Sequence, residues 1–196
     1  MNGLDAGLQK MRHAGMPDAA LRAFAHYYKR LGDPDAGALP ESALEPVAEI
    51  ADVEDLPVDQ AAARQSLDRA IVLKLNGGLG TSMGLKGPKS LLPVKNGLTF
   101  LELIARQILS LRSRLGRPIP LVLMNSFVTD GDTSRALGRH PGLASEVSGT
   151  FMQSRFPKLW PDDLSPVSWP QNPALEWAPP GHGDLLTGAS SPGFPL

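Results

Sequence analysis

The pattern of apolar and polar positions divides the chain into helical and strand-like stretches. Over residues 16–31 the apolar side chains recur every three or four positions, at Leu21, Phe24, Tyr28 and Leu31. This spacing predicts an amphipathic helix that Gly32 and Pro34 end. Pro17 and Asp18 suit its first turn, where a missing N–H costs nothing and an acidic side chain is favourable.

Two short apolar runs, residues 70–75 and 120–125, predict strands. The first stops abruptly at Asn76-Gly77-Gly78, which is typical of a buried parallel strand that meets a loop. A weaker strand is predicted near residues 149–153.

A second helix is predicted between the first two runs. Thr99 and Glu102 match a capping box, and Gly116 and Pro118 end the helical stretch. Its predicted apolar face consists of Phe100, Ile104, Ile108 and Leu111. The order strand, loop, helix, strand predicts adjacent parallel strands of an α/β fold. Ligands of such sheets bind at the carboxyl ends of the strands, here residues 76–80 and 125–129.

Proline dominates the last part of the chain. The sequence has 19 prolines, about twice the usual frequency of roughly 5%. Many follow Ser154, and their spacing disfavours long helices and central strands there. We therefore divide the chain into an N-terminal helical segment (1–69), a partial sheet domain (70–184) and a tail (185–196).

Composition and charge exclude several classes of function. With 196 residues, of which 42% are apolar, the chain can form one buried core. A net charge of -1, from 19 basic and 20 acidic residues, provides no basic stripe for nucleic acid or anionic membrane. The absence of cysteine excludes disulfides and a cysteine nucleophile. Without a signal-peptide pattern or an apolar run of about 18 residues, we expect a cytoplasmic protein.

The segment from Leu75 to Gly84 has four glycines in ten residues and directly follows a predicted strand. Glycines allow the backbone to approach a ligand closely, and successive N–H groups can bind phosphate oxygens. Pro88 stands before Lys89, where a Walker loop would need a glycine N–H. The spacing of Gly78, Gly80 and Gly84 also has one residue too many for a dinucleotide fingerprint.

Four ordered motifs resemble one enzyme family. They are residues 75–90, the stretch 123–130 that begins Leu-Met-Asn-Ser-Phe, residues 151–157 and residues 179–184. Together they are similar to the UTP:glucose-1-phosphate uridylyltransferases (UDP-glucose pyrophosphorylases) of the long, eukaryotic-like type. The resemblance implies a Rossmann-like nucleotidyltransferase (GT-A-like) sheet with N-terminal helices. It also implies the conversion of UTP and glucose 1-phosphate into UDP-glucose and diphosphate, with Mg²⁺.

The resemblance also implies roles for individual residues. Leu75, Asn76, Gly77 and Gly78 would hold the nucleotide, and Gly77 and Gly78 would also lie near the sugar phosphate. Lys89 would be the catalytic cation that neutralises the triphosphate. Gln153 and Gly181 would contact the uracil, and His182 would contact the sugar phosphate.

Two charged features nearby have simpler interpretations. Lys86 is expected to be a solvated loop cation, because the resemblance assigns the phosphate role to Lys89. Asp130-Gly131-Asp132 resembles a metal-binding pair, but its place after the second strand favours a capped helix start. No metal ligand is predicted within this chain.

The family's later features are not found in residues 185–196, namely the Asp that binds Mg²⁺, a second catalytic Lys and a β-helical domain. The resemblance therefore implies an incomplete chain of low stability and little turnover, for which we hypothesise a frameshift or premature end. One alternative is a non-catalytic UTP-binding fragment or pseudoenzyme. Another is a UDP-N-acetylhexosamine pyrophosphorylase, which Ser82-Met83 disfavours because those enzymes usually have Arg-Leu there. No oligomeric state is predicted.

Overall fold

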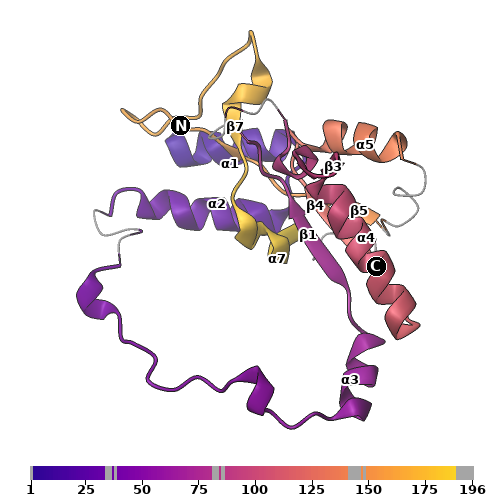
Figure 1. Cartoon of the computed structure of the whole chain (residues 1–196). Helices are drawn as coiled ribbons and strands as arrows, with labels where there is room; N and C mark the ends of the chain where they lie inside the picture. The colour runs from indigo at the N-terminus through magenta and orange to yellow at the C-terminus, as the bar shows by residue number, and fades with distance from the viewer. Residues whose placement is uncertain are drawn as a thin grey trace.

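A computed structural model describes residues 2–33, 37, 39–80, 84, 87–140, 147 and 149–188. It combines a parallel sheet with helices (Figure 1). The helices are α1 (Gly3–His13), α2 (Asp18–Arg30), α3 (Gln60–Leu67), α4 (Phe100–Leu115), α5 (Asp130–Gly138) and α7 (Leu185–Gly188). The strands are β1 (Val72–Asn76), β2 (Pro93–Lys95), β3 (Leu98–Thr99), β4 (Leu121–Asn125), β5 (Gly149–Met152), β6 (Phe156–Pro157) and β7 (Trp177–Ala178).

The parallel sheet has the strand order β1-β4-β5. Its register pairs Asn76 with Asn125 and Asn125 with Met152, so the three strands end level with one another. All of β4 is buried, as expected for the central strand of a parallel sheet. The predicted α/β order and the third strand are confirmed, although β1 begins at Val72 rather than at residue 70.

Helix α4 packs on the sheet beside β4. Its start has both bonds of a capping box, with Thr99 Oγ1 accepting from the Glu102 N–H at 3.2 Å and Glu102 Oε2 accepting from the Thr99 N–H at 2.8 Å. Gly116 ends it in the left-handed conformation, with φ of 62°. The predicted apolar face was wrong at Phe100, which is 43% exposed. The buried face is centred one position later, on Leu101, Ala105 and Ile108.

Helices α1 and α2 lie side by side and pack on the segment around β6 and β7 (Figure 1). Their core consists of Met11, Ala20, Leu21 and Phe24, against which Phe156, Leu159 and Trp177 pack. The amphipathic helix predicted at 16–31 is confirmed as α2. Helix α1 was not predicted, although its apolar residues have helical spacing and Asn2 caps it by accepting from the Asp5 N–H at 2.8 Å.

An ion pair ties α1 to the proline-rich segment. Lys10 Nζ lies 2.5 Å from Glu176 Oε2 and 2.5 Å from the carbonyl oxygen of Val167. The same ammonium lies 5.3 Å from the ring centroid of Trp177, and the Arg155 guanidinium lies 4.6 Å from that centroid. The first helix is thus fastened to residues far along the chain.

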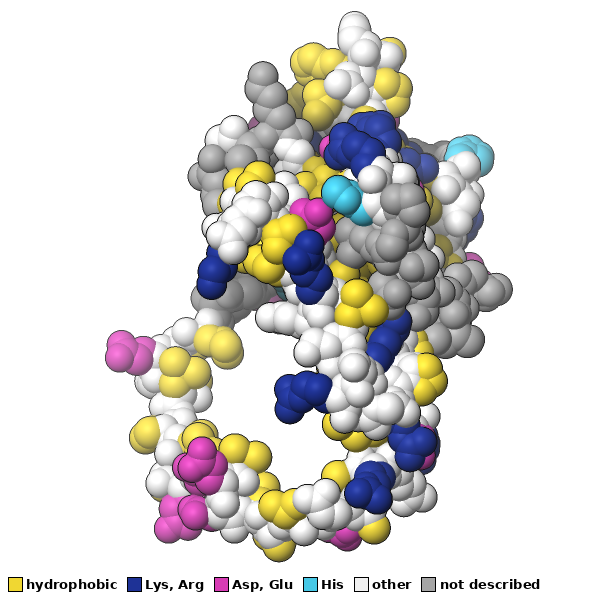
Figure 2. Space-filling model, turned by 45° about the vertical axis from the view of Figure 1, so that its right-hand side comes forward, with side chains coloured by type: hydrophobic (Ala, Val, Ile, Leu, Met, Phe, Trp, Pro, Cys, Tyr) yellow, Lys and Arg dark blue, Asp and Glu magenta, His cyan; other side chains and the backbone are white. Residues whose placement is uncertain are grey.

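Residues 39–59 form an extended, exposed segment between α2 and α3 (Figure 1). Hydrophobic and acidic side chains follow one another along it (Figure 2). Its exposed large hydrophobic residues include Leu44, Val47, Ile50, Val53 and Leu56. In the described part of the chain, no helix is long and apolar enough to cross a membrane.

Replacing Thr99 with Ala should lower the free energy of unfolding by about 1 kcal/mol, because the Glu102 N–H loses its capping oxygen. Urea denaturation followed by circular dichroism measures this. Ser113→Ala, at an exposed position in the last turn of the same helix, is the matched control and should leave stability unchanged or slightly higher. Equal stability of Thr99→Ala and wild type would contradict the capping role.

Glu176→Gln should destabilise the protein in a pH-dependent way. The hydrogen bond from Lys10, together with the Trp169 N–H, lowers the pKa of the Glu176 carboxyl below its ordinary value of 4.5. A lowered folded-state pKa means that the stabilisation is fully present above pH 4.5 and is lost as pH falls through the folded-state pKa.

Thermal unfolding at a series of pH values measures this difference. The melting temperature of Glu176→Gln should lie below that of wild type at pH 7, and the gap should close in acid. Glu45→Gln, in the exposed segment, is the matched control and should show no gap. A gap that widens in acid would be incompatible with this ion pair.

Candidate functional site

The glycine-rich loop after β1 doubles back on the residues that precede Lys89. The Lys89 N–H donates to the Gly78 carbonyl at 3.0 Å, and the Gly80 N–H donates to the Gly87 carbonyl at 3.1 Å. This places the Lys89 side chain over the loop, because a Cβ added to Gly78 would lie 3.9 Å from Lys89 Cδ. Pro88 has no N–H to donate, and neither of these two hydrogen bonds requires one from it.

A cavity of about 480 Å³ opens at the carboxyl end of β1. Its described lining consists of Lys74, Leu75, Asn76, Gly78, Lys89, Ser90 and His182. Five of the predicted site residues therefore share one cavity, including His182 from near the end of the described chain. Gly77, Gln153 and Gly181 are not among its described lining residues.

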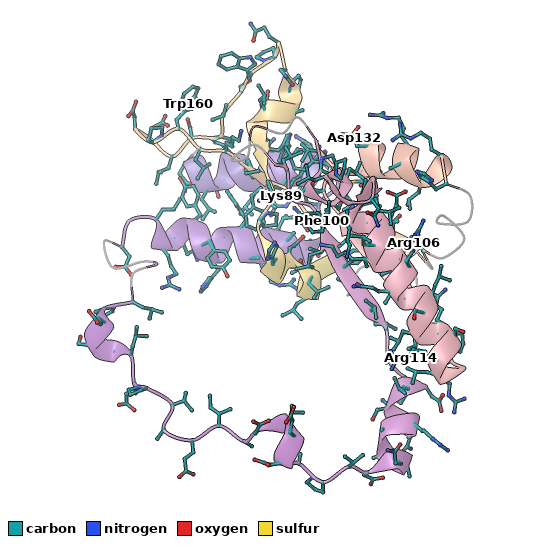
Figure 3. All side chains as sticks on the ribbon, viewed as in Figure 1. Lys89, Phe100, Arg106, Arg114, Asp132 and Trp160 are labelled. Atoms are coloured by element: carbon teal, nitrogen blue, oxygen red, sulfur yellow. The ribbon has the colours of Figure 1, made fainter. Side chains whose placement is uncertain are left out.

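Two cationic side chains belong to the described lining of this cavity, Lys74 from β1 and Lys89 from the residues after the glycine-rich loop. Lys89 lies near β1, whereas Arg106 and Arg114 lie along α4 (Figure 3). No ion pair joins Lys89 to a carboxylate within the described ranges. Its charge is therefore available to an anionic ligand.

A buried network of polar side chains holds the ends of β1 and β4 together. Asn76 Nδ2 donates to Asn125 Oδ1 at 2.7 Å and lies 2.9 Å from Thr133 Oγ1. Asn125 Nδ2 in turn donates to Asp130 Oδ1 at 2.8 Å. Ser126 Oγ donates to the Gly77 carbonyl at 2.9 Å, which fixes the start of the glycine-rich loop.

Two atoms on the cavity wall have no partner in the described part of the chain. Asn76 Oδ1 and Ser90 Oγ are buried there without a hydrogen bond. A buried polar group left unpaired costs free energy. Both atoms belong to residues that line the cavity, and their unpaired state is a local cost of this arrangement.

Gln153 lies against the glycine-rich loop. It is 7% exposed, and its N–H donates to the Asn125 carbonyl at 2.8 Å. A Cβ added to Gly77 would lie only 2.8 Å from Gln153 Oε1. Glycine is thus required at 77 for the side-chain amide to keep its place. The structure brings these two predicted residues together.

His182 stands in a short 3-10 helix (His182–Asp184) that follows a glycine turn. Gly181 has φ of 103° and ψ of -177°, a conformation that is essentially restricted to glycine. The turn directs the chain so that His182 reaches the cavity formed by β1 and Lys89.

Some residues of the site were missed from the sequence. Lys74 and Ser90 line the cavity. Asp184 follows the lining residue His182 closely in the sequence and is buried. Lys74 is a lone cation in an apolar run, a signal that could have been noticed. Ser90 carries no such signal, since its buried position depends on how the loop folds.

The acidic residues after β4 have structural partners. Asp130 accepts the hydrogen bond from Asn125, and Asp132 pairs with Arg135 within α5. The helix start expected here is confirmed, since α5 begins at Asp130, but the expected cap is not, because the N-cap residue Thr129 makes no side-chain cap hydrogen bond. Within the described lining of the cavity no carboxylate occurs, so the lining residues do not fit the Mg²⁺ that the resemblance implies.

Several residues on which predictions were based lie outside the described ranges. They are Thr81, Ser82, Met83, Lys86 and the stretch 189–196. By contrast, residues 185–188, assigned to a tail from the sequence, form α7. Gly188 packs on Phe151, whose ring would lie 2.7 Å from an added Cβ.

Comparison with known proteins identifies the family. Residues 21–193 match the family described as UTP--glucose-1-phosphate uridylyltransferase. The chain belongs to this family. It is 46% identical over 132 residues to the UTP--glucose-1-phosphate uridylyltransferase of Solanum tuberosum, covering 67% of this chain and 28% of that relative. For the enzyme of Saccharomyces cerevisiae the identity is 48% over 122 residues, covering 62% and 24%.

Solved structures of the family have the same fold. A mutant UDP-glucose pyrophosphorylase from Leishmania major, in complex with UDP-glucose, has a TM-score of 0.88 and 39% identity, covering 99% of this chain and 40% of that one. A structure from Trypanosoma brucei has a TM-score of 0.78 and 39% identity, covering 94% and 38%. The chain thus spans only part of the length of the uridylyltransferases it matches.

Gly77→Ala should displace the Gln153 side-chain amide while the protein stays folded. The atom that an added methyl would meet is the far end of a flexible side chain, which can move at little cost. Gly78→Ala meets only an ordinary contact and should leave Gln153 in place.

The resonances of the Gln153 side-chain amide in NMR spectra report this displacement. They should shift in Gly77→Ala and stay near wild type in Gly78→Ala. Gly32→Ala, where no atom lies within 4 Å of an added Cβ, is the distant control. Unshifted resonances in Gly77→Ala would show that the close contact does not exist.

Proposed function

We propose that this chain carries the UTP-binding part of a UTP:glucose-1-phosphate uridylyltransferase, which converts UTP and glucose 1-phosphate into UDP-glucose and diphosphate. The observation that carries the proposal is the cavity at the end of β1, where a glycine-rich loop, Lys89 and His182 meet. The family of the chain supports the choice of substrates.

The reaction requires little covalent chemistry from the protein. A phosphate oxygen of glucose 1-phosphate attacks the α-phosphorus of UTP, and the bond from that phosphorus to the bridging oxygen breaks as diphosphate leaves. Catalysis of such a step is mainly positioning and neutralisation of charge. The proposal gives Lys89 the second task, because its side chain passes Gly78 and lines the cavity where the phosphates would lie.

The proposal assigns the nucleotide-binding roles to residues at the end of β1, in its loop and beside it. Leu75, Asn76, Gly77 and Gly78 form the end of β1 and the start of its loop, where backbone can approach a nucleotide. Gln153 offers both a donor and an acceptor, which match the N–H and carbonyl groups on the edge of uracil. Gly181 presents backbone without a side chain, as suits a flat base.

His182 is the proposed contact to the sugar phosphate. It lines the same cavity as Lys89, although the two residues are far apart in the sequence. The proposal thus places the nucleotide phosphates and the sugar phosphate in one cavity, with Gly77 and Gly78 near both. A UDP-N-acetylhexosamine substrate is not favoured, because the matched relatives are UTP--glucose-1-phosphate uridylyltransferases.

Isothermal titration calorimetry with UTP tests the proposal. The purified chain should give saturable heat, and Lys89→Ala should weaken UTP binding about tenfold, which corresponds to ~1.4 kcal/mol for a lost charged contact. His182→Ala should weaken binding of glucose 1-phosphate to the UTP-loaded chain more than binding of UTP itself.

Lys29→Ala, an exposed lysine on α2, is the matched control and should bind UTP like wild type. A coupled assay for UDP-glucose formation with the same protein separates turnover from binding alone. Absence of saturable UTP binding, or equal binding by Lys89→Ala and wild type, would refute the assigned site.

A further inference from the structure

Asp184 is a buried carboxylate that the proposed reaction does not use. Only 7% of the residue is exposed, and no ion pair joins it to a cation in the described part of the chain. Burying a carboxylate is costly unless hydrogen bonds compensate it. Its partners therefore indicate what this side chain does.

Both carboxylate oxygens of Asp184 have partners. Oδ2 accepts the backbone N–H of Ser154 at 2.5 Å, although the two residues are far apart in sequence. Oδ1 accepts the hydroxyl of Thr187, which also lies 2.9 Å from the Asp184 carbonyl oxygen. One side chain thus bridges the end of the sheet and the segment that carries His182.

The bridge holds the backbone on one side of Gln153. The Gln153 N–H donates to the Asn125 carbonyl at 2.8 Å, and the next N–H along the chain, that of Ser154, donates to Asp184. The Gln153 side chain meanwhile lies against Gly77. Without the Asp184 carboxylate, the backbone on the C-terminal side of Gln153 would lose the hydrogen bond of the Ser154 N–H.

The bridge also holds the turn that carries His182. Asp184 is the last residue of the 3-10 helix that Gly181 precedes, and its N–H donates to the Gly181 carbonyl at 3.3 Å. Asp184 thus holds the residue after Gln153 through its carboxylate and holds Gly181 through its backbone N–H.

We propose that Asp184 is a positioning residue that fixes Gln153 and the Gly181 turn relative to each other and thereby sets the selectivity for uracil. The inference rests on the proposed function, since it assigns the base to these two residues. Cytosine has an amino group and an unprotonated ring nitrogen where uracil has a carbonyl and an N–H. A fixed amide discriminates between these patterns, whereas an amide free to turn does not.

Calorimetric titration of the full chain with UTP, CTP and inorganic triphosphate tests this role. In Asp184→Ala the ratio of the CTP Kd to the UTP Kd should fall about tenfold, while the Kd of inorganic triphosphate stays at the wild-type value. Asp184→Asn keeps an acceptor for the Ser154 N–H and should recover most of the ratio. Thr99→Ala, which weakens α4 away from this bridge, is the control for lost stability and should keep the wild-type ratio.

A second measurement covers the case in which Asp184→Ala does not fold. Hydrogen exchange followed by NMR should show the wild-type Ser154 amide protected at least about tenfold relative to its intrinsic rate. An unprotected Ser154 amide would overturn the proposal. So would a selectivity ratio in folded Asp184→Ala equal to that of wild type.

These outcomes separate the two proposals. If the wild-type chain binds UTP and Asp184→Ala discriminates equally well, the role of Asp184 is wrong and the nucleotide site stands. If the wild-type chain does not bind UTP, the proposed function fails and the role of Asp184 in base selectivity fails with it.

Discussion

The hydrogen bond between Asn76 and Asn125 joins the ends of two parallel strands, and the site depends on it. The register of the sheet pairs Asn76 with Asn125, so that their side-chain amides form a hydrogen bond. Because both side chains are buried, loss of this bond would leave a polar group unpaired in the interior. In a low-dielectric interior an unpaired amide would be costly, so the network through Asp130 and Thr133 favours one arrangement of the strand ends. The glycine-rich loop starts from this fixed point.

The loop itself is shaped by what its glycines allow. At Gly77 the missing side chain lets the Gln153 amide lie against the backbone, and Ser126 holds the Gly77 carbonyl. The pairing of Gly78 with Lys89 then brings a cation over the start of the loop. The two glycines therefore allow two close contacts: Gly77 lies against the Gln153 amide, and Gly78 lies against the Lys89 side chain.

Helices α1 and α2 and the segment around β6 and β7 support this arrangement. Helices α1 and α2 pack on the segment around β6 and β7, and the Lys10–Glu176 ion pair fastens them there. That segment connects Gln153 to the turn at Gly181. The N-terminal helices thus brace the connection between the two residues proposed to contact the base.

The sequence by itself determined the local elements and the family. The spacing of apolar residues predicted α2, β1 and β4. The pair Thr99 and Glu102, together with Gly116, predicted the start and end of α4. These signals act between residues that are close in the sequence. The apolar face of α4 was misplaced at Phe100, since which side of a helix is buried depends on the surface it meets. Only the tertiary structure decided that Ser90 lines the cavity and that Asp184 holds the Ser154 N–H. Such contacts join residues that are far apart in the chain, and no local sequence pattern predicts them.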